Sequence, residues 1–305
     1  MTFNQLHKST ITKNYNLIKS KTGWKFVFNA MASPCEIILT NCSRKDAERL
    51  SKIAVNETKR IEMKFSRYRD DNIVYEVNNS NGRTVSIDEE ISRLLVFADQ
   101  CHKASNGLFD ITSGILRKVW LFDGSSEIPK NEDVTEILCK VGWEKVHWDS
   151  KSITLAPGME LDFGGIGKEY AVDRVLLMLT ENHNGPILVN FGGDIATNGT
   201  LFPNQNWNVG IEAVGNKKVT NLLNVKGGAI ATSGDARRFL LRDGIRYSHI
   251  LNPKNGWPVK DAPHSITVAA PGCLQAGMLS TIALLQGAHA ERFLDDNSIT
   301  YCSQR

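Results

Sequence analysis

The sequence predicts an α+β fold, and the order of its segments supports this class. Some segments carry apolar residues at helical spacing and others have the character of strands, but the two kinds do not alternate in the regular rhythm of a parallel βα protein. The chain has 305 residues, of which 41% are hydrophobic and 23% charged, as is usual for a soluble globular protein. This length allows a large core, in one big domain or two lobes.

The expected elements begin after a polar, interrupted N-terminal extension, residues 1–24. "WKFVFNAMASPCEIIL" predicts two short strands around the turn Met31–Pro34. The pair Asn106-Gly107 is typical of a helix C-cap, and "VHWDSKSITLAPG" is typical of a β-hairpin. Helical spacing predicts three helices in this half of the chain, at Arg44 to about Met63, about Ile91 to Ala104, and near Val134 to Val141.

A glycine loop opens a further helix in "LDFGGIGKEYAVDRVLLML". We interpret Leu161–Phe163 as a strand end, Gly164–Gly167 as a tight loop and Lys168–Leu179 as the helix. Backbone N–H groups at a helix start, with Lys168 in the first turn, favour an anion site. The loop is too short for a P-loop, and Tyr170 stands where the dinucleotide fingerprint needs its third glycine. Glycines that simply allow close helix–sheet packing are an equally good interpretation.

Two more glycine pairs follow strands or precede them. "ILVNFGGDIATNG" reads as a buried apolar strand that ends in Gly192-Gly193-Asp194. "GGAIATSGDARRFLL" places Gly227-Gly228 before a strand and Ser233-Gly234-Asp235 after it. Each pair brings a small-residue backbone near an acidic side chain, an arrangement that plain turns also produce.

A histidine stands near the end of the next expected strand, in "RYSHILNPKNGWPV". Residues Arg246–Leu251 are expected to form the strand, which ends at the turn chemistry of Asn252-Pro253. Because strand side chains alternate, His249 would share a face with its apolar neighbours two residues away. One interpretation is a half-buried structural histidine that is hydrogen-bonded to the turn. A functional histidine is the other.

Composition excludes several classes of partner and site. The formal net charge is only +3, and no block of like charges or basic stripe interleaved with aromatic residues appears, which disfavours nucleic acid. The N-terminus lacks the apolar core of a signal peptide, and no segment approaches the roughly 20 apolar residues that span a bilayer. We therefore expect a cytoplasmic protein with no membrane partner. The six scattered cysteines lack C-x-x-C spacing, which disfavours zinc and a disulfide framework.

The motifs form an ordered set that resembles a known family, the FAD:protein FMN transferases, or ApbE-type flavin transferases. The resemblance covers about Lys25 to Leu294. It rests on seven stretches: Ala30–Ile37, Phe65–Arg69, Gly107–Asp110, Asp162–Lys168, Asn190–Asp194, Ala231–Asp235 and Tyr247–Pro253. The resemblance implies one flavin transferase domain, residues 25–305, with an ApbE-like fold related to the T-fold: antiparallel or mixed sheets packed with helices, and an FAD cleft between lobes.

The resemblance also implies a reaction and a set of site residues. FMN would pass from FAD to a Ser or Thr hydroxyl of an acceptor flavoprotein with an FMN-binding domain, with release of AMP. His249 falls at the family's histidine, and an imidazole that titrates near neutral pH suits a general base. Mg²⁺ would be held by Gly165 and Thr281. Positions that match FAD contacts are Met31, Tyr68, Leu108, Phe109, Asp110, Asp162, Lys168 and Ile250.

The chain departs from the family pattern at several of these positions. Gly277 stands where the family has the acidic Mg²⁺ ligand, four residues before Thr281, and glycine has no carboxylate. The metal would then use Thr281, backbone carbonyls near Gly165, substrate phosphates and another carboxylate such as Asp194 or Asp235, or bind weakly. We expect Gly277→Asp to supply the absent oxygen ligand.

Three smaller departures accompany this one. Asn252 replaces the aspartate before the proline, which removes a negative charge beside His249 and would lower the basicity of that ring. Ala32 and Glu169 replace family glycines, and both replacements look tolerable.

Two other functions remain open from the sequence. The altered metal position is compatible with an FAD-binding or FAD-hydrolysing protein, in which water replaces the acceptor hydroxyl and FMN and AMP are released. A non-catalytic flavin carrier is the third possibility. The acceptor is expected to be cytoplasmic, such as a reductase with a fused FMN-binding domain.

Overall fold

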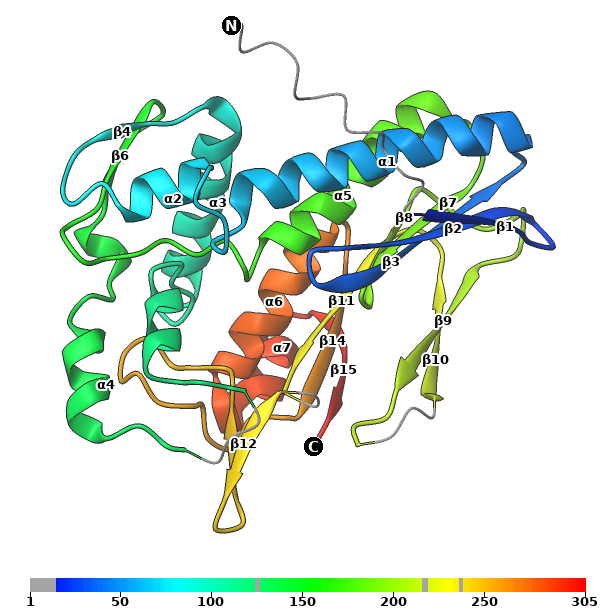
Figure 1. Ribbon diagram of the computed structural model, residues 1–305. Helices are drawn as coiled ribbons and strands as arrows, with labels where there is room; N and C mark the ends of the chain where they lie inside the picture. Colours follow the sequence, from blue (N-terminus) through cyan, green and yellow to red (C-terminus); the bar gives the residue numbers. More distant parts are fainter. Residues whose placement is uncertain (1–14, 124–126, 216–218, 236–237) are drawn as a thin grey trace, which may run out of the picture.

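An eight-stranded antiparallel sheet forms the centre of the computed structural model, which describes residues 15–123, 127–215, 219–235 and 238–305 (Figure 1). The strand order is β1-β2-β3-β7-β8-β11-β14-β15. Helices pack against this sheet, so the predicted α+β class is confirmed. Its strands are β1 (Tyr15–Lys19), β2 (Gly23–Ala30), β3 (Ser33–Thr40), β7 (Ile187–Phe191), β8 (Asp194–Thr197), β11 (Gly228–Gly234), β14 (Ser265–Ala270) and β15 (Thr300–Gln304).

Two tight turns of the sheet lie at predicted positions. The β7–β8 turn places Gly192 and Gly193 at φ 64° and 104°, a region in which glycine is unstrained. The β2–β3 turn uses Met31 and Ala32 at φ 52° and 55°, which is unusual for residues with a Cβ. A hydrogen bond from the Met31 amide to Glu62 Oε1, at 2.6 Å, holds this strained turn in place.

Three helices line up across one face of the sheet: α1 (Arg44–Phe65), α5 (Gly167–Asn182) and α6 (Cys273–Leu285). Ser43 caps α1 by accepting a hydrogen bond from the amide of Asp46, at 3.1 Å. Helix α5 packs between the other two and contacts β7 and β8. The apolar stripe predicted for α1 is buried: Ala47, Leu50, Ala54 and Ile61.

The opposite face of the sheet is covered by a hairpin, β9 (Trp207–Glu212) and β10 (Val219–Val225). Trp207 and Val225 pack there against sheet residues that include Leu188 and Ile230. Because successive strand residues point to opposite faces, Val189 faces the helices while its neighbour Leu188 faces this hairpin. The central strands are therefore buried on both sides, as the apolar run 187–191 predicted.

A second lobe lies between α1 and α5 in the sequence and contains a small sheet in the order β4-β6-β5. Trp120, a buried residue of this lobe, donates its Nε1–H to the Gly256 carbonyl at 2.8 Å. This hydrogen bond links the lobe to the chain after β13. The elements of this lobe are α2 (Ile73–Asn78), β4 (Val85–Ser86), α3 (Glu89–Ala104), η1 (Ser113–Lys118), α4 (Asn131–Leu138), η2 (Trp143–Lys145), β5 (His147–Trp148) and β6 (Ser152–Thr154). The remaining elements are β12 (Phe239–Arg242), β13 (Ile245–Ser248), η3 (Gly287–His289) and α7 (Ala290–Asp296).

Four sequence expectations differ from the structure. Part of the extension 1–24 forms β1, which pairs with β2; residues 1–14 lie outside the described residues. The segment 161–163 is no strand, because its backbone bonds to Ile111 and to the side chain of Asn78 rather than to a sheet. Helix α4 lies three residues earlier than predicted. Strand β13 ends at Ser248, because the Ile250 carbonyl accepts from Val259 in a loop that folds back.

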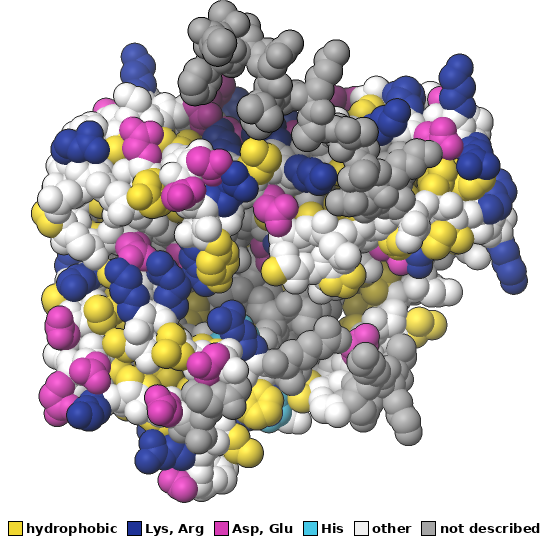
Figure 2. All heavy atoms as spheres, viewed as in Figure 1, with side chains coloured by type: hydrophobic (Ala, Val, Ile, Leu, Met, Phe, Trp, Pro, Cys, Tyr) yellow, Lys and Arg dark blue, Asp and Glu magenta, His cyan; other side chains and the backbone are white. Residues whose placement is uncertain are grey.

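The surface and the cysteines agree with the composition. Acidic and basic side chains are interspersed on the face shown in Figure 2, as a net charge of +3 leads us to expect. All six cysteines lie in the described part of the chain as free thiols. None of the described helices combines the length and apolar character needed to cross a membrane.

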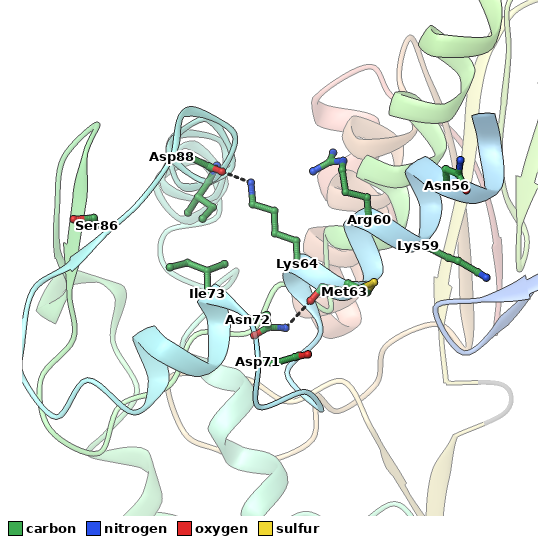
Figure 3. A pocket seen from close by; sticks show the side chains of 11 residues that line it. Asn56, Lys59, Arg60, Met63, Lys64, Asp71, Asn72, Ile73, Ser86 and Asp88 are labelled. Atoms are coloured by element: carbon green, nitrogen blue, oxygen red, sulfur yellow. Dashed lines mark hydrogen bonds and ion pairs between the residues drawn. The ribbon is translucent and has the colours of Figure 1, made fainter. Parts of the chain in front are cut away.

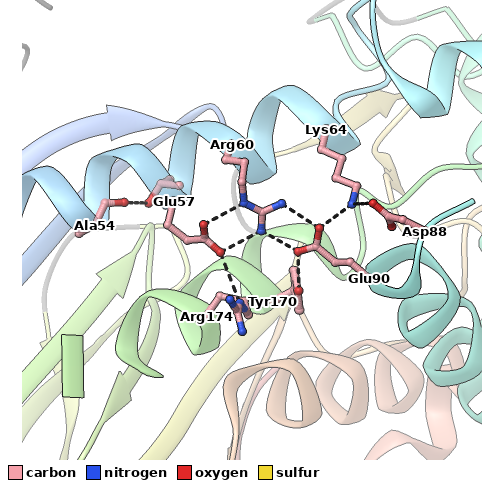
Figure 4. A network of polar contacts seen from close by, with 9 residues as sticks. Ala54, Glu57, Arg60, Lys64, Asp88, Glu90, Tyr170 and Arg174 are labelled. Carbon is pink, nitrogen blue, oxygen red and sulfur yellow. Dashed lines mark hydrogen bonds and ion pairs between the residues drawn. The ribbon is translucent and has the colours of Figure 1, made fainter. Parts of the chain in front are cut away.

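A network of ion pairs fixes α5 against α1 and α3 (Figure 4). Arg60 of α1 donates to Glu57 at 2.9 Å and to Glu90 of α3 at 2.6 and 2.8 Å. Tyr170 of α5 donates to Glu90 at 2.7 Å. Burial alone would raise the pKa of Glu90, but hydrogen bonds from Arg60, Lys64 and Tyr170 outweigh it and lower this pKa to about 2. The network positions the first turns of α5.

We expect Arg60→Met to reduce both the stability and its pH dependence. Because the folded pKa of Glu90 is depressed, its contribution is present above the unfolded pKa of about 4.3 and is lost as the pH falls toward about 2. Partial exposure of Arg60 limits the loss at pH 7 to about 1–2 kcal/mol of unfolding free energy. Urea unfolding at pH 7 and pH 3 measures it.

Arg93→Met is the matched control for this change. Arg93 pairs with Glu89 at 2.6 Å on the exposed surface of α3, so its loss should cost less than about 0.5 kcal/mol. Equal effects of the two substitutions, or an unchanged fall in stability between pH 7 and pH 3 in Arg60→Met, would show that the network contributes nothing specific.

Candidate active site

The glycine loop before α5 forms an open patch of backbone. The amides of Ile166 and Gly167 both donate to the Phe163 carbonyl, at 3.0 and 2.7 Å, so the loop turns directly into the helix as predicted. Gly164 and Gly165 are exposed. An exposed backbone at the positive end of a helix dipole suits a phosphate.

Two predicted FAD contacts border this loop. A Cβ built on Gly165 would lie 3.8 Å from the ring of Phe109, and one on Gly167 would lie 4.0 Å from Met31 Cε. Phe109 is buried, whereas Met31 is partly exposed at the tip of the β2–β3 turn. The structure thus brings residues from three distant parts of the sequence to one loop.

Asp162 also lies at this loop and is held by an arginine. Its Oδ1 accepts from the Gly164 amide at 2.8 Å, and its Oδ2 forms an ion pair with Arg67. Arg67 donates in turn to the hydroxyl of Tyr68, at 2.9 Å. A Cβ at Gly114 would come within 2.4 Å of Asp162 Cβ, so the close approach requires glycine there. Tyr68 is 82% exposed, and the Arg67 guanidinium lies over its ring, 5.0 Å from the centroid.

Three other predicted FAD contacts, Leu108, Asp110 and Ile250, differ in how far their side chains are exposed to solvent. Leu108 and Ile250 are partly exposed. Asp110 is buried, and its two carboxylate oxygens accept hydrogen bonds from Thr112, at 2.6 and 2.7 Å, and from the Trp143 amide, at 2.9 Å. In this structure the Asp110 carboxylate therefore fixes the loop around it. Its contact with FAD stays a prediction.

A buried charge cluster lies at the start of α5. Lys168 forms an ion pair with Asp194 of β8, which is 1% exposed and also accepts from the Thr232 amide at 3.2 Å. The next residue, Glu169, is 9% exposed. Burial raises the pKa of Glu169 to about 8, and the charge of Asp194 adds to this rise while that of Lys168 opposes it. Two carboxyl groups thus share one ammonium group.

Glu169 lies directly against Gly277 of α6. A Cβ built on Gly277 would come within 2.6 Å of Glu169 Cγ and 3.1 Å of its Oε1. There is no room for a side chain at 277 while Glu169 keeps this position. An aspartate at 277 could therefore act as a metal ligand only if the Glu169 side chain moved.

Hydroxyl groups continue the site along α6. Thr281 lies one helical turn beyond Gly277, and its Oγ1 is 2.8 Å from Ser233 Oγ. Ser233 is also 2.8 Å from the hydroxyl of Ser280. Asp235, the other carboxylate considered as a metal ligand, is engaged elsewhere: it accepts from Arg246 at 2.8 and 3.0 Å and lies 3.1 Å from His264 Nδ1.

His249 follows the last residue of β13 and is oriented by a backbone carbonyl. Its Nδ1 lies 2.9 Å from the Arg238 carbonyl oxygen. A carbonyl only accepts, so Nδ1 carries the proton and Nε2 of the neutral ring keeps its lone pair. Burial lowers the pKa of His249 below 6.5; the hydrogen bond to the Arg238 carbonyl opposes this fall, and the charge of Arg238 adds to it.

One cleft among the described residues lies close to His249, because Phe122 lines it and also contacts the His249 ring. This cleft, of about 370 Å³, is lined by residues that include Arg67, Tyr68, Phe122 and Arg238. The Phe122 ring lies 6.2 Å from the His249 ring, edge to face. Arg117 and Lys118 add further positive charge to the lining. The cleft therefore joins the surroundings of Asp162 to those of His249.

The larger cleft, of about 700 Å³, lies beside α1 and the start of α3 (Figure 3). Several of its polar side chains are engaged: Lys64 is paired with Asp88, and Asn72 donates to the Met63 carbonyl at 2.8 Å. Of the described residues that line it, none is a predicted site residue. Size alone therefore does not identify the site.

Comparison with known proteins gives one consistent result. The profile of the ApbE family matches residues 31–302. The chain belongs to the ApbE family. It is 28% identical over 257 residues to the FAD:protein FMN transferase of Haemophilus influenzae, which covers 80% of this chain and 73% of that protein. The Treponema pallidum FAD:protein FMN transferase is 30% identical over 248 residues, with coverage of 74% and 68%.

Solved structures of the ApbE family share the fold. The crystal structure of the ApbE protein from Thermotoga maritima superposes with a TM-score of 0.83 at 27% identity, over 95% of this chain and 94% of that one. The apo flavinyl transferase ApbE of Pseudomonas stutzeri gives a TM-score of 0.80 at 25% identity, over 94% and 90%. The ApbE-like architecture that the motifs implied is confirmed.

The resemblance to the family implied a bound Mg²⁺, so the described residues must be able to supply ligands for this ion. The described residues contain no group of three or more His, Cys, Asp or Glu side chains that could hold a metal. Mg²⁺ that acts on phosphates is usually held by one or two carboxylates together with substrate oxygens, so a larger cluster is unnecessary. The buried Glu169 carboxylate and the Thr281 hydroxyl are oxygen donors of the kind that Mg²⁺ prefers, and they fit the ion.

Sequence reasoning missed three groups that the structure places at the site. Arg67 lies inside the recognised stretch Phe65–Arg69, and Arg238 lies shortly after the stretch Ala231–Asp235. Nothing in the sequence shows that one pairs with Asp162 and that the other orients His249. Glu169 was judged a tolerable replacement for glycine. The signal that could have found it was the coincidence of two departures, an added carboxylate at 169 and a lost one at 277.

Proposed function

We infer that this ApbE-family chain is an FAD:protein FMN transferase, which attaches FMN from FAD to a Ser or Thr hydroxyl of an acceptor flavoprotein. The observation that carries the proposal is the orientation of His249: its Nδ1–H is fixed by the Arg238 carbonyl, and Nε2 is left unprotonated beside the cleft. A neutral imidazole with a lowered pKa is suited to take a proton from an alcohol at neutral pH.

The reaction balances with these groups. The acceptor oxygen attacks the phosphorus of the FMN half of the pyrophosphate, and its proton passes to His249 Nε2. A new P–O bond to the acceptor forms while the bond from this phosphorus to the bridging oxygen breaks, and AMP leaves with that oxygen. Positioning and charge neutralisation are the main contributions of protein to such a transfer.

Other residues have supporting roles in the proposal. Lys168 would meet a phosphate at the start of α5, and Asp162 a ribose or adenine edge of FAD. Apolar and aromatic groups would enclose the flavin. The full set of proposed FAD contacts is Met31, Tyr68, Leu108, Phe109, Asp110, Asp162, Lys168 and Ile250. Mg²⁺, with Thr281 and the Gly165 carbonyl among its ligands, would offset the negative charge of the phosphates.

Mass spectrometry of an acceptor tests the function. We expect the purified protein, incubated with FAD, Mg²⁺ and an FMN-binding domain that carries an acceptor Ser or Thr, to add the mass of one phosphate-linked FMN to that domain. AMP should appear in equal amount. The same domain with its acceptor hydroxyl replaced by Ala is the control and should gain no mass.

Other outcomes would favour the alternatives. Release of FMN and AMP with no gain of mass by any acceptor indicates FAD hydrolysis, and tight FAD binding without turnover indicates a carrier. We further propose a cytoplasmic protein with a cytoplasmic acceptor. Recovery of the flavinylated acceptor only beyond the cytoplasmic membrane would contradict that location.

A further inference from the structure

The side chain of Glu169, on α5, occupies the space beside Gly277, on α6. Glu169 lies in the first turn of α5, and its side chain fills the space that a side chain on α6 at 277 would need, with 2.6 Å between Glu169 Cγ and the built Cβ. One carboxylate therefore fits between α5 and α6 at this level. This chain supplies it from α5.

The Glu169 carboxylate is not satisfied by the protein. Its Oε2 is among the buried side-chain atoms of the described chain that have no hydrogen-bond partner. The only ammonium group of the cluster, Lys168, is already paired with Asp194. A buried carboxyl oxygen without a partner is costly and calls for an explanation such as a proton or an ion.

We propose that Glu169 is a ligand of the divalent cation, in place of the carboxylate that this chain lacks at 277. The cation would also contact the Thr281 hydroxyl, which lies one turn along the same face of α6, and the phosphates of FAD. This assignment rests on the proposed function only for the phosphate ligands. The carboxylate and the hydroxyl belong to the chain itself.

Charge supports a cation at this point. Glu169 and Asp194 are both at least 91% buried, and Lys168 offsets only one of them. A divalent ion would balance the second carboxylate once that group is ionised, and it would still carry charge toward a phosphate. Asp194 does not compete for the ion, because its carboxylate is already paired with Lys168.

The test counts bound metal rather than product. Mn²⁺, an ion that also prefers oxygen ligands, is titrated into the protein with and without FAD, and the free ion is measured by electron paramagnetic resonance. Glu169→Gln keeps the shape of the side chain and removes its charge. We expect it to weaken Mn²⁺ binding by at least about tenfold, since even groups outside the first coordination sphere act on that scale. Unchanged binding would overturn the proposal.

Moving the carboxylate provides the second arm. Gly277→Asp alone should not tighten Mn²⁺ binding, because Glu169 fills the space that the new side chain needs. Combining Glu169→Gly with Gly277→Asp should restore binding to within about threefold of wild type. Tighter binding by the single Gly277→Asp variant, or no recovery in a folded double variant, would show that the two positions do not share one ligand site.

The two proposals fail in different ways. If Glu169→Gln loses Mn²⁺ binding but the wild-type protein adds no mass to any acceptor, the metal-ligand proposal is supported and the proposed transferase function is wrong. If the wild-type protein transfers FMN but Glu169→Gln binds Mn²⁺ as tightly as wild type, the transferase function is supported and the metal-ligand proposal is wrong.

Discussion

His249→Ala should reduce FMN transfer by roughly 10²–10⁴-fold and leave FAD affinity within about tenfold of wild type. A positioned general base contributes about this much to a rate, and the ring is oriented for the task by the Arg238 carbonyl at 2.9 Å. FAD binding depends mainly on other groups, so it should be nearly retained. Single-turnover transfer to a fixed acceptor and an FAD titration measure the two effects separately.

His183→Ala is the matched control. His183 also bonds to a backbone carbonyl, with Nε2 2.8 Å from Thr40 O, and it is not among the proposed site residues. A transfer rate in folded His249→Ala that is close to that of His183→Ala would remove His249 from the catalytic role.

The pH profile provides an independent readout for His249. Because burial depresses its pKa below 6.5, the neutral base is present at neutral pH and is lost as the pH falls through the depressed value. Transfer by wild type should therefore decline only below about pH 6.5. The residual activity of His249→Ala should lack this acid limb.

Local patterns in the sequence were sufficient to predict several elements of the fold. The apolar stripe of α1 and the turn at Met31 and Ala32 depend on residues close together in the chain, and both were predicted correctly. The end of β13 was not, because it is set by a hydrogen bond between Ile250 and Val259 in a loop that folds back. Strand termination there is a tertiary effect that local propensity does not contain.

The same distinction applies to the candidate site. Ordered motifs indicated the glycine loop and His249, since each motif is continuous in sequence. The partners that tune these groups come from elsewhere: Arg67 pairs with Asp162, and Glu169 fills the space beside Gly277. Such pairs are defined by the packing of helices and loops, so a single sequence shows both members without showing their contact.

Lys168→Met is expected to have the largest effect on both stability and FAD binding. Asp194 is 1% exposed, and removal of its cation leaves a buried carboxylate without a counter-charge, which costs about 3 kcal/mol or more of unfolding free energy. The lost interaction with a phosphate should weaken FAD binding by at least about tenfold, as charged hydrogen bonds contribute about 1.5–3 kcal/mol. Urea unfolding at pH 8 and an FAD titration measure these effects.

A double variant separates the structural effect of Lys168 from its proposed role in binding. Combining Lys168→Met with Asp194→Asn removes both charges, so the buried carboxylate no longer destabilises the fold and much of the lost stability should return. FAD affinity should stay low, because no ammonium group faces the phosphate. If FAD affinity recovers along with stability, Lys168 serves only to neutralise Asp194, and the exposed backbone of the glycine loop, with the dipole of α5, is the phosphate site.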